Sequence, residues 1–123
     1  MKPLKVLAKR GEEVPWVKLK DTPGFGGADI PGVYCKFFGA SERGPWFYVV
    51  KHDPGTVVGK HSHDSAVIHY ILEGSWKLGG QTFGPGFFQY EQMGLEYGPI
   101  LSGPEGSVFL AIYDTPPSFH PAQ

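Results

Sequence analysis

Glycine and proline interrupt this chain so often that long helices have little room to form. The 123 residues include 18 glycines and 12 prolines, which are spread along the whole length. Inside a helix, proline costs about 3 kcal/mol and glycine about 1 kcal/mol relative to alanine. No window of about twelve residues shows the apolar periodicity of an amphipathic helix. We therefore expect strands joined by frequent turns.

Aromatic and β-branched residues gather in short runs between these turn signals. Such residues favour strands, and many short runs separated by glycine and proline are typical of β-sandwiches and β-barrels. The runs are WVKL, GVYCKFF, WFYVVKH, AVIHYIL, SWKLGG, FFQYE and SVFLAIY. The sequence therefore predicts an all-β fold.

The length of the chain and the lack of an internal repeat indicate one domain over residues 1–123. An N-terminal arm and loop are expected over residues 1–32, ending in the glycine-rich segment 20–32. The barrel core is expected at about residues 33–114. The proline-rich end, residues 115–123, is expected to be irregular.

Charge and hydropathy exclude several classes of function. The 11 basic and 12 acidic residues nearly balance, and no basic stripe indicates nucleic-acid binding. No apolar run approaches the roughly 18 residues of a membrane span, and the N-terminus has no apolar signal-peptide core. Cys35, the single cysteine, cannot form an internal disulfide and is expected to pack in a strand. We expect a cytoplasmic protein that binds neither nucleic acid nor membrane.

Three of the five histidines fall within residues 60–69, KHSHDSAVIH. Alternate residues of a strand share a face at about 6 to 7 Å, so His61 and His63 are expected to point the same way. A turn follows at Asp64, and the next strand would place Val67 and His69 on one face. The spacing therefore predicts that His61 and His63 converge on one site, as metal ligands do, and His69 joins them if Val67 faces the same side. The remaining two histidines are expected to have no chemical role.

The stretch PGTVVGKHSHDSAVIHYILEGSWKLGG, residues 54–80, resembles the first conserved motif of the cupins. That motif has a glycine, five residues, His-x-His, then a glutamate and a later glycine; Gly55, His61, His63 and Gly74 match it. The chain is most similar to small single-domain cupins, namely acetylacetone and dihydroxyacetophenone dioxygenases and the sensor cupins of ChrR-type anti-sigma factors. The resemblance implies a jelly-roll β-barrel, a divalent metal in its mouth, and a homodimer.

Two positions of this sequence depart from the cupin pattern. The glutamate ligand of the first motif falls on Val67, which cannot bind a metal. The second motif corresponds to PGFFQYEQMGLEYGP, residues 85–99, and its histidine ligand falls on Tyr97. The resemblance alone therefore leaves His61 and His63 as the firm ligand pair.

Several side chains could complete the site. His69 is the first candidate for a third ligand, and Tyr97 is the second, as a phenolate whose pKa a metal lowers. Tyr97 could equally act as a general acid or as a donor to an oxyanion. Glu91 shares its strand face with Gln89, and it either lines the cavity or points to solvent. Glu96 is expected to point away from Tyr97.

The resemblance implies a metal-dependent enzyme for a small, enolisable or aromatic ketone-type substrate. Fe(II) is the first choice of metal and would imply O2-dependent cleavage of a C–C bond, with His69 and Tyr97 as candidate catalytic residues. Zn, Ni or Mn would suit a lyase or isomerase step. A non-catalytic small-molecule or metal sensor is the alternative from a different class. A metal-free isomerase, with a histidine base and Tyr97 as acid, is a further alternative.

Overall fold

The computed structural model describes residues 6–41 and 43–122, and it confirms an all-β fold. Short 3-10 turns are its only helical elements within the described residues, and none of its helices there is long and apolar enough to cross a membrane. The elements are η1 (Gly11–Glu13), β1 (Val17–Lys18), η2 (Leu19–Asp21), η3 (Phe25–Gly27), β2 (Val33–Ala40), β3 (Trp46–His52), β4 (Val57–Val58), β5 (His61–Ser62), β6 (Val67–Leu78), β7 (Gln81–Phe83), β8 (Phe88–Glu91), β9 (Ile100–Tyr113) and β10 (His120–Pro121).

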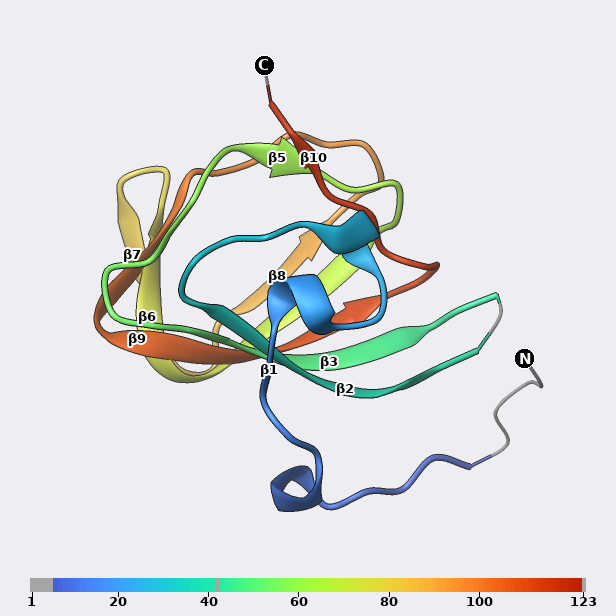
Figure 1. Cartoon of the computed structure of the whole chain (residues 1–123). Helices are drawn as coiled ribbons and strands as arrows, with labels where there is room; N and C mark the ends of the chain where they lie inside the picture. The colour runs from blue at the N-terminus through green and yellow to red at the C-terminus, as the bar shows by residue number, and fades with distance from the viewer. Residues whose placement is uncertain (1–5, 42, 123) are drawn as a thin grey trace.

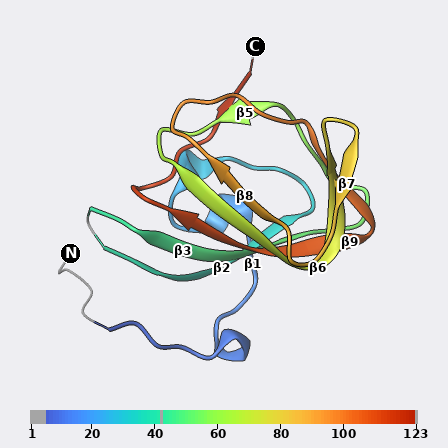
Figure 2. The same ribbon diagram turned by 180° about the vertical axis from the view of Figure 1, so that it is seen from behind.

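The strands close around one interior as a jelly roll (Figure 1). The larger sheet has the antiparallel order β1-β2-β3-β9-β6-β7, with β4 joined to β9 and β8 joined to β6. A second sheet of two strands, β10 and β5, lies across the interior from the larger one, and the view from behind shows β8 running beside β6 (Figure 2). The order is non-sequential, so strands distant in the chain meet at the same end of the barrel.

Burial along β6 follows the alternation that the sequence predicts. Val67, His69 and Ile71 are buried, whereas Tyr70 and Leu72 at the alternate positions are exposed. Because neighbouring side chains of a strand point to opposite faces, this pattern places His69 inside the barrel. The local prediction for the face of His69 is therefore confirmed.

Gly74, the glycine at the end of YILEG, is required by the packing of β6 against β9. Its φ is +71°, and an added Cβ would lie 2.1 Å from the carbonyl oxygen of Gly106. No side chain fits at such a distance, and a left-handed backbone adds strain for any other residue. The glycine of the first motif is thus explained by close backbone approach.

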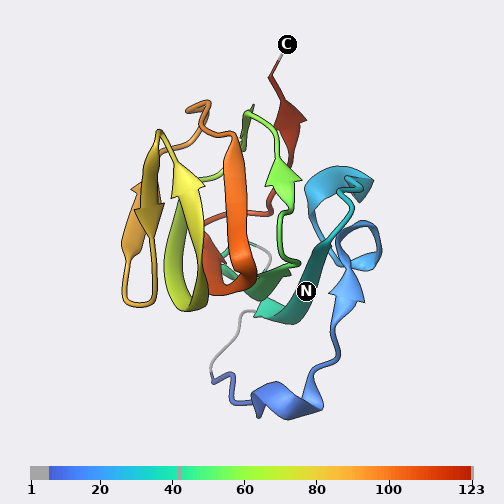
Figure 3. The same ribbon diagram turned by 90° about the vertical axis from the view of Figure 1, so that its left-hand side faces the viewer.

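The last described part of the chain combines an irregular segment, residues 115–119, with the short strand β10 (His120–Pro121). β10 pairs with β5, placing His120 opposite Ser62, and Ala122 N–H donates to the carbonyl of Lys60 at 2.9 Å. In the side view the end of the chain runs beside β5 (Figure 3). Local composition gave no sign of β10, because this strand forms by pairing with a strand some 60 residues earlier in the chain.

Candidate functional site

Backbone pairing brings the two cupin motifs together at His61. His61 N–H donates to the carbonyl of Tyr97 at 3.0 Å, and Tyr97 N–H donates to the carbonyl of His61 at 2.9 Å. Gly94 N–H donates to the carbonyl of His63 at 2.8 Å. The rings of His61 and Tyr97 consequently lie 4.5 Å apart between centroids. Motif spacing predicted that Tyr97 occupies the site, and this pairing explains how it does so.

Backbone carbonyls fix the protonation of both motif histidines. His61 Nδ1 donates to Gly59 O at 2.7 Å, and His63 Nδ1 donates to Ser118 O at 2.5 Å. A carbonyl can only accept, so the proton of each neutral ring is on Nδ1 and the lone pair is on Nε2. Burial is the main cause that lowers the pKa of His61, and it lowers the pKa of His63 to about 4. Both rings are therefore neutral at neutral pH, the form that binds a metal or accepts a proton.

Tyr97 reaches the free nitrogen of His63. Its hydroxyl donates to His63 Nε2 at 3.2 Å. Burial, and then the nearby Tyr113 and Glu91, raise the pKa of Tyr97 well above its usual value. In the protein alone Tyr97 is thus a neutral phenol, and its hydroxyl proton points to the imidazole of His63.

These side chains surround an apolar cavity of about 60 Å³. His61, His63, His69 and Tyr97 line it, so the structure brings together all four residues that the sequence singled out. The rest of the wall is mainly aliphatic and aromatic. His52 in β3 also lines the cavity; burial lowers its pKa to about 3, so it too is neutral. A lone histidine in an apolar strand gave no signal of this position.

A carboxylate also lies inside the barrel. Glu91 in β8 is 5% exposed, and its Oε1 accepts a hydrogen bond from Gln89 Nε2. Oε1 is 3.7 Å from His69 Nδ1, too far for a hydrogen bond. His69 Nδ1 and Glu91 Oε2 are both buried without a hydrogen-bond partner. Of the two positions expected for Glu91, the structure therefore has the inward one, and Glu96 is exposed as expected.

A divalent metal requires several side-chain donor atoms around one point. Within residues 6–41 and 43–122, no three His, Cys, Asp or Glu side chains lie close enough together to hold an ion. The two motif histidines still have suitable donor chemistry, because the Nε2 atoms of His61 and His63 carry no proton.

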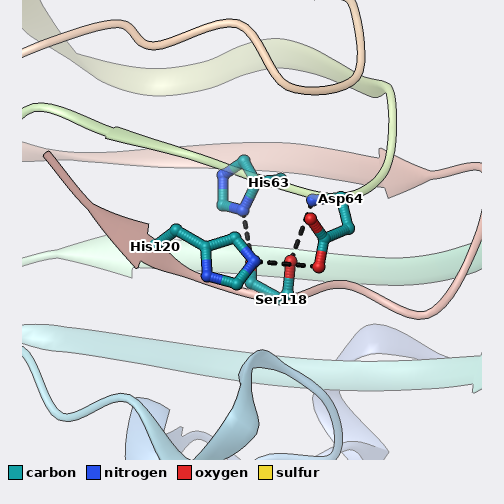
Figure 4. Close-up of polar contacts among 4 residues, drawn as sticks. All are labelled: His63, Asp64, Ser118 and His120. Carbon is teal, nitrogen blue, oxygen red and sulfur yellow. Dashed lines mark hydrogen bonds and ion pairs between the residues drawn. The ribbon is translucent and has the colours of Figure 1, made fainter.

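The C-terminal segment supplies the partner of His63. Ser118 accepts twice, at its carbonyl from His63 Nδ1 and at its Oγ from the backbone N–H of Asp64 at 2.8 Å (Figure 4). His120 Nε2 lies 2.8 Å from Asp64 Oδ2, and this contact is the main cause that lowers the pKa of Asp64. These bonds tie the segment to the turn after the His-x-His motif.

The same segment covers the other motif histidine. The ring of Phe119 stacks on that of His61 with centroids 4.5 Å apart and planes 24° apart. The segment is also hydrogen-bonded to η3, where the backbone N–H of Phe25 donates to the carbonyl of Pro117 at 2.7 Å. Phe119 and Ser118 are thus site residues that sequence reasoning missed, and no local signal marks them.

A jelly-roll barrel with an inward His-x-His motif at its mouth defines a cupin. The chain belongs to the ChrR cupin-like domain family, whose model matches residues 8–115. The resemblance to cupins that the sequence indicated is therefore confirmed. No curated protein matches this sequence.

Solved structures of cupins share this fold at low sequence identity. An acetylacetone dioxygenase from Acinetobacter johnsonii is 17% identical over 97% of this chain and 80% of its own, with a TM-score of 0.69. The polyketide cyclase RemF from Streptomyces resistomycificus is 18% identical over 100% of this chain and 86% of its own, with a TM-score of 0.72. The anti-sigma factor ChrR, in its Rhodobacter sphaeroides complex with SigE, is 21% identical; 85% of this chain covers 51% of that chain, with a TM-score of 0.65.

Proposed function

We propose that this chain is a cupin enzyme that uses a divalent metal to act on a small, enolisable or aromatic ketone. The observation that carries the proposal is the pair of neutral imidazoles at His61 and His63. Their Nδ1 protons are held by backbone carbonyls, which leaves both Nε2 atoms unprotonated beside an apolar cavity, that of His63 in contact with the Tyr97 hydroxyl. Fixing Nδ1 in this way is how proteins orient histidine ligands toward a metal.

His61 and His63 would hold the ion, with Tyr97 and His69 as the further donors that line the same cavity. A bound ion would polarise a substrate carbonyl, and Fe(II), the first choice, would also supply oxygen chemistry; Zn, Ni or Mn would suit a lyase or isomerase step. Tyr97 is placed to give a proton to, or take one from, a substrate oxygen. The apolar wall excludes water and so strengthens these polar contacts.

The size of the cavity limits the substrate. About 60 Å³ is far below the 300–1,000 Å³ of sites for drug-sized ligands, so the substrate has few non-hydrogen atoms. Two structural neighbours are named for acetylacetone and for a polyketide, compounds rich in ketone groups. A small 1,3-diketone, which forms a stable enolate, fits both the cavity and the neutral imidazoles.

Metal content and oxygen uptake test this proposal together. We expect the purified protein to bind one divalent ion per chain and, with Fe(II), to consume O2 on addition of acetylacetone or a hydroxyaryl ketone. His61→Ala should lose metal and activity together. Glu96→Gln, at an exposed side chain, is the control. Full metal occupancy in the His61 variant would remove His61 from the ligand set.

The same experiment distinguishes two alternative functions from the proposed one. A non-redox lyase or isomerase is favoured by the hydrogen bond from Tyr97 to His63, which forms an acid–base pair without a metal. Substrate conversion without O2 uptake would support it. A sensor is favoured by the family itself, since ChrR is an anti-sigma factor. Metal binding without any turnover would support that function.

We also propose that the chain forms a homodimer through the outer face of β6 and β8. Tyr70 lies opposite Phe88, and Ile68 opposite Tyr90, on this face. Phe88 and Tyr90 are 58% and 59% exposed, and none of these four side chains is charged. Contiguous exposed apolar patches on a soluble domain mark interfaces. Light scattering should give twice the chain mass, and Phe88→Lys should give the monomer mass.

A further inference from the structure

The inner cavity beside His61 and His63 meets solvent on one side. All but three of the described residues that line it are buried. The three that are only half-buried are Ile30, Tyr97 and Phe119. A small molecule that reaches the motif histidines therefore has to pass where these three side chains lie.

An outer groove of about 450 Å³ lies on this side of the barrel, between residues 25–30 and residues 118–121. The C-terminal segment runs past η3 here (Figure 1). Phe25, Ile30 and Phe119 line both the outer groove and the inner cavity. These three side chains thus form the partition between the two spaces.

Phe25 is the fixed part of this partition. It is 5% exposed, and its ring packs against those of Tyr48 and Tyr113 with centroids 5.1 and 5.3 Å away. Its φ is +62°, the only positive value of a non-glycine residue within 6–41 and 43–122. A strained backbone persists only where the surrounding structure enforces it. Phe25 is therefore locked by its neighbours and cannot open a way in.

Phe119 is the part of the partition that can turn. The backbone of its segment is held on both sides, at Ser118 by His63 Nδ1 and at Ala122 by the carbonyl of Lys60. The half-buried ring of Phe119 contacts only side chains, and the nearest is His61, on which it stacks at 4.5 Å. Side chains change rotamer much faster than a hydrogen-bonded segment moves. Rotation of this ring opens the partition without breaking a backbone hydrogen bond.

We propose that Phe119 is a side-chain gate between the outer groove and the inner cavity, and that its bulk selects substrates by size. The inference rests on the proposed function in taking the cavity as the substrate site, and it adds the residue that determines specificity. A compact aliphatic ketone or its enol passes beside the turned ring. An aryl-substituted ketone needs more room than Phe119 leaves, so aliphatic substrates are favoured.

The single cysteine makes entry measurable without turnover. Cys35 lines the inner cavity and is 0% exposed. The protein is treated with methyl methanethiosulfonate or with the bulkier benzyl methanethiosulfonate, and mass spectrometry follows the alkylthio group added to Cys35. Burial raises the pKa of Cys35 to about 12, which slows both reactions alike. The ratio of the benzyl rate to the methyl rate, divided by the same ratio for free cysteine, therefore measures size selection.

We expect this ratio to be well below one in wild type and at least about tenfold higher in Phe119→Ala, the scale on which apolar sites discriminate by size. Phe119→Leu, which keeps part of the bulk, should fall between the two. Met93→Ala shortens a side chain that is 66% exposed and lines neither space, so it is the control and should match wild type. Circular dichroism verifies that each variant is folded.

Entry through the gate differs from labelling through unfolding in its response to urea. The free energy of unfolding falls linearly with urea, so labelling through the unfolded state rises steeply. Benzyl labelling of Phe119→Ala should instead stay constant in low urea. Equal ratios in Phe119→Ala and wild type, or benzyl labelling that rises steeply with urea, would overturn the gate and leave the proposed function standing. Loss of the proposed function in the metal and oxygen assays would leave these ratios unchanged.

Discussion

Replacing His52 with leucine is expected to flatten the pH dependence of folding stability on the acid side of neutrality. His52 is 4% exposed at the end of β3, and its Nδ1 has no hydrogen-bond partner. Burial, and then the nearby His69 and His61, lower its pKa from 6.5 to about 3. The folded protein therefore holds this imidazole neutral at a pH where an unfolded chain would protonate it.

The sign and size of the effect follow from the two pKa values. Between pH 6.5 and about 3 the unfolded state binds more protons, so the stability is complete above pH 6.5 and falls as the pH drops toward 3. At pH 5 the unfolded state gains about 2 kcal/mol from protonation of this one residue. That loss is a sizeable part of the roughly 5–15 kcal/mol that stabilises a typical domain.

Urea unfolding of the metal-free protein, at a series of pH values from neutral down to 5, measures the effect. Protonation of His61 and His63 also contributes, but it contributes to both proteins and cancels in their difference. Wild type should lose about 2 kcal/mol more than His52→Leu over this range. Parallel curves for the two proteins would refute the reasoning, because His52 would then titrate alike in the folded and unfolded states.

Three further perturbations probe the site and the barrel. Tyr97→Phe removes the donor to His63 Nε2 and should lower the free energy of unfolding of the metal-free protein by about 1–3 kcal/mol, measured in urea. Ending the chain at Thr115 removes the carbonyl that fixes His63 and should weaken metal binding by roughly 10–100-fold in calorimetry. Gly74→Ala should lower the melting temperature, since its Cβ would lie 2.1 Å from Gly106 O and the substitution costs at least about 1 kcal/mol.

The parts of the site that the sequence predicted are those set by local geometry. Alternation along a strand is enough to turn His61 and His63 one way and to bury His69 with Val67. The resemblance to the second cupin motif placed Tyr97 in the site, and that motif counts residues along one short segment, 85–99. The short runs between glycines likewise predicted the strands, since turn chemistry acts over a few residues.

The parts that the sequence did not predict depend on which strands become neighbours. The parity of Glu91 was evident, but its inward direction depends on β8 pairing with β6. Ser118 and Phe119 reach the histidines only because β10 pairs with β5, across nearly half of the chain. Such register is set by the closed barrel, and periodicity within a segment carries no information about it.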